Sequence, residues 1–135
     1  MPVRKIVGRI SCHATEDERR IKDSIRFLLT EKAKVKEFTL LGHHGNPIKV
    51  FEASLSDEET IKSVISRLKD GLREDIHTLR DSFSERIENN VYFLRLDKQE
   101  LVKGGYKLAN DGESIQLKIF IKSKERFSTE MFGGI

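Results

Sequence analysis

Five short segments of the chain are predicted to be β-strands, and in the first and last of them apolar residues recur at every second position, the pattern of strands that bury one face. The alternation is clearest near the end of the chain, where Ile115, Leu117, Ile119 and Ile121 are separated by single residues of other kinds. The predicted strands span residues 3–12, 35–41, 48–55, 91–96 and 115–122.

Two other segments show the three-to-four-residue spacing of an amphipathic helix. The first begins at Thr15, which has capping-box spacing to Glu18, and the second begins at Ser56, with Glu59 at the same spacing. Gly71 is expected to end or weaken the second helix, with helix resuming beyond it. The apolar stripes are Ile21, Ile25, Leu28 and Leu29 in the first helix, and Ile61, Val64, Ile65, Leu68 and Leu72 in the second.

The elements follow one another as strand, helix, strand, strand, helix, strand, strand. Short connections between successive strands favour antiparallel pairing, and two helices can cover only one face of the sheet. We therefore expect an α+β fold with a mostly antiparallel sheet of about five strands and both helices on one face. Residues 1–123 would form a single domain, and residues 124–135, where the pattern dissolves, a flexible C-terminal tail.

The composition of the chain narrows the classes of protein to which it can belong. No segment approaches the roughly 20 apolar residues of a membrane span, and the charged N-terminal segment does not resemble a signal peptide. Cys12 is the only cysteine, so no disulfide can form within the chain. We expect a cytoplasmic protein without a membrane partner.

The net charge of +3 is small, but the charges are unevenly distributed. Residues 56–90 contain six Lys/Arg and nine Asp/Glu, so the basic excess lies in the remaining segments, mostly on strands and their flanks. A protein with this distribution can present one positive face to a polyanion. The same imbalance can also arise by chance on a densely charged surface.

The predicted strands place basic and aromatic side chains opposite the core. If the isoleucine face of the last strand is buried, Lys118, Phe120 and Lys122 point outward, and Lys5 and Arg9 do so from the first strand. Arg95 could join them, although the register of its strand is ambiguous. Lysine and arginine contact phosphates, and an exposed phenylalanine can stack on an unpaired base. The alternative is that outward lysines only keep the sheet edges from aggregating.

The loop at residues 42–47, Gly-His-His-Gly-Asn-Pro, connects two predicted strands. Gly42 and Gly45 can adopt positive φ at low cost, which would let backbone amides turn toward an anion such as an RNA phosphate. His43 and His44 add donors that gain charge near pH 6.5 when unperturbed. The competing interpretation is that these residues only form a tight turn.

Three segments together carry a family resemblance: His-Ala-Thr-Glu-Asp at 13–17, Gly-His-His-Gly-Asn-Pro-Ile at 42–48, and Arg-Leu-Asp-Lys-Gln at 95–99. In this order and spacing the chain resembles an archaeal family of predicted exosome subunits or RNA-binding proteins, whose fold is similar to that of the ribosomal protein that carries 5S RNA. The resemblance implies binding of structured or ribosomal RNA, with exosome or ribosome-associated proteins as partners. It implies no catalytic residues.

Enzymatic alternatives have less support in the sequence. Zinc binding by Cys12 and His13 with the two loop histidines lacks metal-ligand spacing, and adjacent strand residues point to opposite faces. Cys12 as a nucleophile lacks a recognisable base. His43 and His44 could act as acid and base in RNA cleavage, with Lys98 steadying the phosphate. Asp97 and Lys98 could instead form an architectural ion pair at the strand end.

We therefore expect a non-catalytic RNA-binding protein without cofactor or metal. The alternatives are an adaptor that does not contact RNA and, less favoured, a metal-free ribonuclease. The predicted RNA-binding residues are Lys5, Arg9, His43, His44, Arg95, Lys98, Lys118, Phe120 and Lys122.

Overall fold

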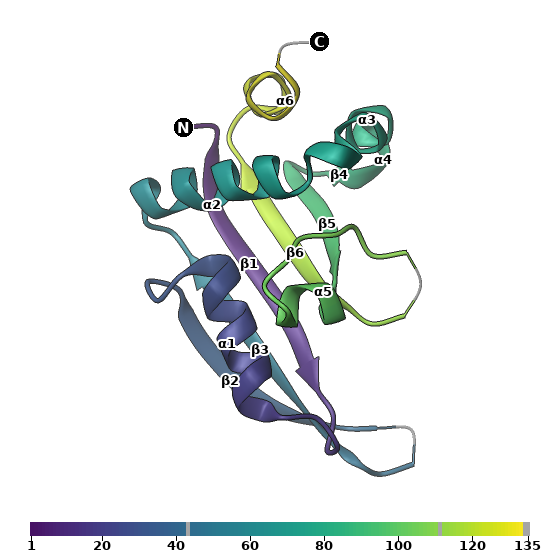
Figure 1. The fold of residues 1–135 in the computed structure, drawn as a ribbon. Helices are drawn as coiled ribbons and strands as arrows, with labels where there is room; N and C mark the ends of the chain where they lie inside the picture. Colours follow the sequence, from purple (N-terminus) through teal and green to yellow (C-terminus); the bar gives the residue numbers. More distant parts are fainter. Residues whose placement is uncertain (43, 111, 134–135) are drawn as a thin grey trace.

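A six-stranded sheet forms the centre of the computed structural model, which describes residues 1–42, 44–110 and 112–133. The strand order is β2-β3-β1-β6-β5-β4, and every neighbouring pair is antiparallel (Figure 1). Five strands lie within one residue of the predicted segments, and the two-residue β4 was not predicted. The bounds are β1 Val3–Cys12, β2 Lys34–Leu41, β3 Pro47–Leu55, β4 Ile87–Glu88, β5 Val91–Asp97 and β6 Ser114–Ile121.

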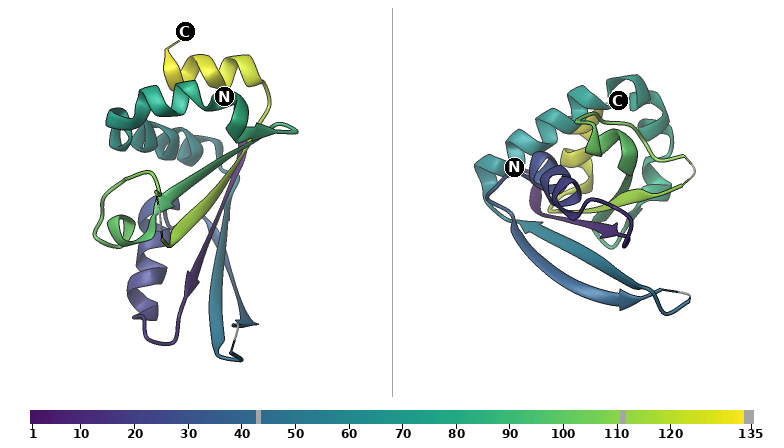
Figure 2. Two further views of the ribbon diagram at one scale, coloured as in Figure 1. Left: turned by 90° about the vertical axis from the view of Figure 1, so that its right-hand side faces the viewer. Right: turned by 60° about the horizontal axis from the view of Figure 1, so that its bottom comes forward.

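Helices cover one face of this sheet. The left-hand view of Figure 2 shows α1 (Glu18–Leu29), α2 (Glu58–Gly71) and α5 (Lys98–Val102) together on one side of the strands. Both predicted apolar stripes are buried against the sheet, including Ile25 and Leu28 of α1 and Leu68 of α2. None of the described helices is long and apolar enough to span a membrane.

The capping residues of the two long helices differ from the prediction. Asp17 caps α1 by accepting a hydrogen bond from the Arg19 amide at 3.0 Å, and Asp57 caps α2 by accepting from the Thr60 amide at 3.0 Å. The predicted capping boxes starting at Thr15 and Ser56 are therefore wrong by one or two residues. An ionised carboxylate at a helix N-terminus also interacts with the helix dipole, which favours aspartate here.

Gly71 ends α2, as predicted, and helix resumes beyond it in the short elements η1 (Arg73–Asp75), α3 (Ile76–Asp81) and α4 (Phe83–Arg86). Packing explains the glycine: a Cβ atom there would lie only 2.4 Å from Cδ2 of the Tyr106 ring. The close approach of this ring therefore requires a residue without a side chain.

Residues 124–132 correct the expectation of a flexible tail, because they form the packed helix α6 (Lys124–Phe132). Ser123 caps the helix, and Phe127 and Met131 are buried one turn apart. The Phe127 ring lies 5.2 Å from that of Tyr92 and 6.2 Å from that of Phe83. The apolar stripe is short and interrupted by charge, so periodicity alone did not reveal it.

Candidate nucleic-acid interface

The sheet face opposite α1, α2 and α5 is called the open face here (Figure 2). Its side chains come from alternate residues of β2, β3, β1, β6 and β5, and the strand register aligns them in rows. One row runs Lys36, Glu52, Arg9, Gln116 and Arg95 across five strands. Three cations therefore lie at intervals of two strands, roughly 10 Å apart.

The adjoining rows add further cations to the open face. Lys118 lies between Val7 and Phe93, and Lys5 lies opposite Phe120. Six cations share this face: Lys5, Arg9, Lys34, Lys36, Arg95 and Lys118. The register places three carboxylates on the same face, Glu52, Glu88 and Asp97, and Asp97 accepts a hydrogen bond from the Glu100 amide at 3.0 Å as the N-cap of α5. The six cations outnumber these carboxylates, so the face carries an excess of positive charge.

These cations are not paired with any carboxylate in the described part of the chain. Within residues 1–42, 44–110 and 112–133, none of the six forms an ion pair within 4.0 Å. By contrast, Lys49, on the helix-covered side of β3, lies 2.5 Å from a Glu18 carboxylate oxygen. The cations of the open face are thus available to an external anion.

Phenylalanine rings lie among the cations. The Arg9 guanidinium is 5.0 Å from the Phe38 ring centroid, and Arg4 and Lys5 are 5.3 and 5.7 Å from that of Phe120. Phe93 is 39% exposed on the same face. Cations held over aromatic rings form a surface that can bind phosphates and stack on bases.

A hollow of about 240 Å³ opens on this face where β1 and β6 separate. Pairing between these strands ends at Arg9 and Gln116, whereas β1 continues alongside β3 as far as Cys12. We call this place the β1–β6 fork. The hollow is lined by Arg9, Ser11, His13, Leu40, Ile48, Val50, Ser114 and Gln116.

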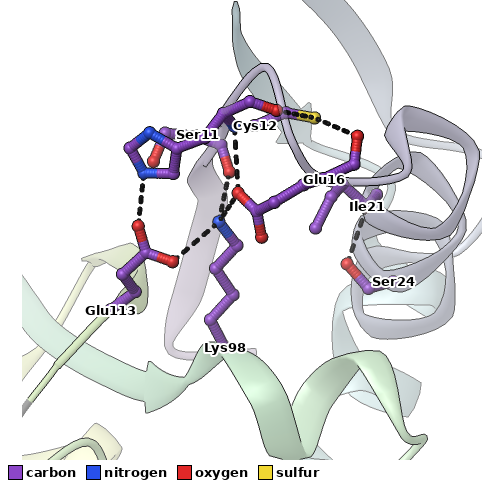
Figure 3. A network of polar contacts seen from close by, with 8 residues as sticks. Ser11, Cys12, Glu16, Ile21, Ser24, Lys98 and Glu113 are labelled. Carbon is purple, nitrogen blue, oxygen red and sulfur yellow. Dashed lines mark hydrogen bonds and ion pairs between the residues drawn. The ribbon is translucent and has the colours of Figure 1, made fainter. Parts of the chain in front are cut away.

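Lys98 is fully buried at the fork, which corrects its assignment as a phosphate contact. Its ammonium donates to the Ser11 carbonyl at 2.7 Å, to Glu16 Oε1 at 2.7 Å and to Glu113 Oε2 at 3.2 Å (Figure 3). A lysine enclosed by three acceptors cannot reach an RNA backbone. Of the two interpretations of Lys98, the architectural one fits, although its partners are Glu16 and Glu113 rather than Asp97.

His13 extends this network by forming a hydrogen bond through Nε2 with Glu113. Its backbone amide donates to Glu16 Oε1 at 2.9 Å. Burial works to raise the pKa of Glu16, but the His13 amide and the Lys98 ammonium outweigh it, and that pKa is lowered. Burial raises the pKa of the nearby Cys12 thiol, which disfavours a thiolate nucleophile or ligand.

A metal ion would have to compete with Lys98 at this place. His13, Glu16 and Glu113 are the described residues whose ligand atoms come close enough to share an ion. The Lys98 ammonium, however, already binds both carboxylates. Among the described residues Cys12 is not part of this group, so the arrangement does not match the zinc site considered from the sequence.

The loop between β2 and β3 closes on itself. The Gly42 amide donates to the Asn46 carbonyl at 2.6 Å, and the Gly45 amide donates to the Gly42 carbonyl at 2.9 Å. These two amides therefore do not turn outward toward an anion, contrary to the expectation. Gly45 does adopt positive φ, at 78°, and His44 is exposed beside it. His43 lies outside the described residues.

A family model described as RNA binding matches residues 5–121. The chain belongs to this RNA-binding family. It is 29% identical over 122 residues to an RNA-binding protein of Pyrococcus abyssi, covering 85% of this chain and 79% of that protein. It is also 29% identical over 116 residues to an uncharacterized protein of Methanocaldococcus jannaschii, covering 80% and 76%.

The fold is shared with a solved structure of the DUF54 protein Mth689 from Methanothermobacter thermautotrophicus. The TM-score is 0.81 at 26% identity, covering 96% of this chain and 95% of that one. These relatives place the chain in an archaeal RNA-binding family. The resemblance stated from the sequence is confirmed to that extent, whereas the exosome link and the likeness to a ribosomal protein stay predictions.

In this RNA-binding family member, the structure brings five of the nine predicted residues together on the open face. They are Lys5, Arg9, Arg95, Lys118 and Phe120. Lys122 is exposed just beyond β6, where its backbone amide donates to the Pro2 carbonyl at 2.6 Å. His44 lies at the far end of the β2–β3 hairpin.

Sequence reasoning missed other members of the face. Lys34, Lys36 and Phe38 belong to it, but β2 is exposed along most of its length, so its pattern gives no inward side. Phe93 was missed because the strand around it is apolar on both sides. Ser11 and Gln116 line the hollow only because β1 and β6, which are far apart in the sequence, separate beside them.

Proposed function

We propose that this chain binds RNA through the open face, with its cations contacting phosphates and its phenylalanine rings contacting bases. One observation carries the proposal: six cations lie in register on a single uncovered sheet face, and none of them pairs with a carboxylate of the described residues. Family membership supplies the class of polyanion. Phosphate neutralisation releases condensed counterions and supplies most of the affinity.

The contact residues follow from this geometry. Lys5, Arg9, Arg95, Lys118 and Phe120 are retained from the sequence prediction, and the position of Lys122 next to β6 keeps it within reach of the same backbone. Lys34, Lys36, Phe38 and Phe93 are added. Structured or ribosomal RNA, and protein partners of the exosome or ribosome, remain the ligands that the family resemblance implies.

A charge-reversal pair tests the proposal. The double variant Lys5→Glu/Lys118→Glu should bind a structured RNA at least about tenfold more weakly at 0.1 M salt, because two phosphate contacts become repulsive. Both side chains point away from the core, so circular dichroism and thermal unfolding should change little. Affinity is measured by fluorescence anisotropy with a labelled RNA.

The matched control is Lys62→Glu/Lys69→Glu on α2, which alters the net charge equally on the helix-covered side. It should change the affinity less than about threefold, since the screening length at this salt is about 10 Å. Equal losses in both double variants would show that net charge rather than the open face governs binding. Undiminished binding by the Lys5→Glu/Lys118→Glu protein would contradict the proposed interface.

The same proposal includes the absence of catalysis. The acid–base groups gathered near the open face, His13, Glu16 and Glu113, are held by one another and by Lys98. Purified protein incubated with labelled RNA, with and without magnesium or manganese, should leave the RNA intact. Cleavage that disappears in a His44→Ala variant would instead support the ribonuclease alternative.

A further inference from the structure

We propose that the hollow at the β1–β6 fork receives one unpaired base, so that the preferred ligand is RNA with unpaired nucleotides beside any duplex. This inference rests on the proposed function, because the open face must first hold the backbone. The inference specifies the class of RNA that is preferred and the residues that recognise its unpaired base.

The lining of the hollow matches a base better than a phosphate. Ser11, Ser114 and Gln116 offer hydroxyl and amide groups that both donate and accept, as the edge of a base requires. Aliphatic residues form the other side of the hollow, suited to the flat face of a heterocycle. They are Leu40, Ile48 and Val50.

A phosphate would find little charge in the hollow. Arg9 is the only lysine or arginine among the lining residues, and its guanidinium lies 5.0 Å from the Phe38 ring. Phosphate binding instead favours the rows outside the hollow, where Lys36, Arg95 and Lys118 are found. The face thus separates a site for a base from the cations around it.

The hollow is held open by the structure itself. At the fork the Ser11 carbonyl accepts a hydrogen bond from the Lys98 ammonium, at 2.7 Å. Lys98 also binds Glu113, which directly precedes β6, and Glu16, which follows β1. These bonds fix both arms of the fork from the helix-covered side. A base can therefore enter a preformed site without first separating the strands.

The shape of RNA explains why the base must be unpaired. In an A-form duplex the major groove is too deep and narrow for side chains to read, and each base is stacked between its neighbours. A base reaches a pocket only when it lies in a loop, a bulge or an end, or is extruded at the cost of unstacking. The hollow therefore selects RNA that already exposes bases.

The test compares two labelled RNAs that share one stem: a blunt hairpin whose strands are joined by a non-nucleotide linker, so that it has no loop bases, and the same hairpin with a four-nucleotide 3′ extension. Wild-type protein should bind the extended RNA about tenfold more tightly than the blunt one. Gln116→Ala removes the edge contacts, and Ser114→Phe fills the hollow. Both should reduce that preference to less than about threefold while retaining the affinity for the blunt hairpin.

Lys118→Gln is the matched control, since Lys118 lies on the same strand and face but outside the hollow. It should weaken binding of both RNAs by similar factors and leave the preference intact. Thermal unfolding of each variant checks that the sheet is retained.

The outcomes separate this inference from the proposed function. Failure of wild-type protein to bind either RNA would overturn both. Equal binding of the two RNAs, or a preference that survives both Gln116→Ala and Ser114→Phe in folded protein, would overturn the base site alone. Loss of blunt-hairpin affinity in the two hollow variants would assign these residues to backbone contact and likewise overturn it.

Discussion

The ammonium of Lys98 binds acceptors from three separate segments: the end of β1, the loop that follows it, and the residue before β6. The side chain is fully buried, so its charge depends on these contacts for the solvation that water would otherwise provide. The residue therefore connects the two arms of the fork electrostatically, and its removal would leave two carboxylates facing each other.

Lys98→Met should lower the free energy of unfolding by about 2 to 4 kcal/mol. The expected loss of unfolding free energy is smaller than for a fully buried ion pair, because Glu113 is 44% exposed and partly solvated. Urea unfolding followed by circular dichroism measures the change. Lys103→Met, at an exposed position just after α5, is the control and should change stability by less than about 0.5 kcal/mol. Similar small changes in both variants would contradict the proposed role of Lys98.

The ionised carboxylate of Glu16 stabilises the folded protein, and this stabilisation depends on pH. Its pKa in the folded protein is lowered below the ordinary value of 4.5. The stabilisation is therefore complete above pH 4.5 and is lost as the pH falls through the folded pKa. Glu16→Gln should lower the free energy of unfolding by about 2 kcal/mol at neutral pH. The difference in unfolding free energy from wild type should shrink below pH 4.5, and a difference independent of pH would exclude the charged contact.

The residue-level predictions succeeded where a strand had one clearly apolar side. The isoleucines of β6 and β1 determine which side is inward, and so place Lys118, Phe120 and Arg9 outward. They failed for Lys98, whose burial depends on Glu16, 82 residues away along the chain. No local pattern indicates such a partner.

Among the elements, α6 illustrates a helix that depends on tertiary contacts. Its residues are largely charged or polar, and it buries only one short stripe, so packing rather than helix propensity stabilises it. Phe127 carries much of that packing through its contacts with the Tyr92 and Phe83 rings. The helix thereby covers part of the core that β5 and α4 leave open.

Phe127→Ala should destabilise the protein by about 3 to 5 kcal/mol, because a buried ring is replaced by a cavity. Thermal unfolding measures the change, and Arg126→Ala, at the exposed neighbouring position, serves as the control. A flexible segment would make the two variants indistinguishable. That result would restore the expectation of a tail.

For the whole molecule, the acidic segment 56–90 and the cations of the open face occupy mostly different elements. The acidic residues of segment 56–90 lie mainly on α2 and the short helices after it, whereas the cations gather on the open face. The six cations of the open face all come from outside segment 56–90, which is where the uneven distribution in the sequence placed the basic excess. The sequence could not predict which strands would be neighbours on that face.

RNA affinity should fall steeply with salt. If four of the six cations each neutralise one phosphate, the slope of log affinity against log salt is between about −3 and −4. Anisotropy titrations at several salt concentrations measure it. The Lys5→Glu/Lys118→Glu variant should show a shallower slope by about 1 to 2. A flat response in the wild-type protein would exclude phosphate contacts as the source of affinity.

The cations of the open face, which pair with no described carboxylate, also have a consequence for the free protein. Like charges held on one face repel one another, and this repulsion lowers the free energy of unfolding of the protein without RNA. Moderate salt should therefore raise the melting temperature of the free protein while weakening its complex with RNA. Neutralising Arg9 or Lys36 should imitate salt in both respects. The cations proposed to bind RNA would then also be the groups that lower the stability of the protein when no RNA is bound.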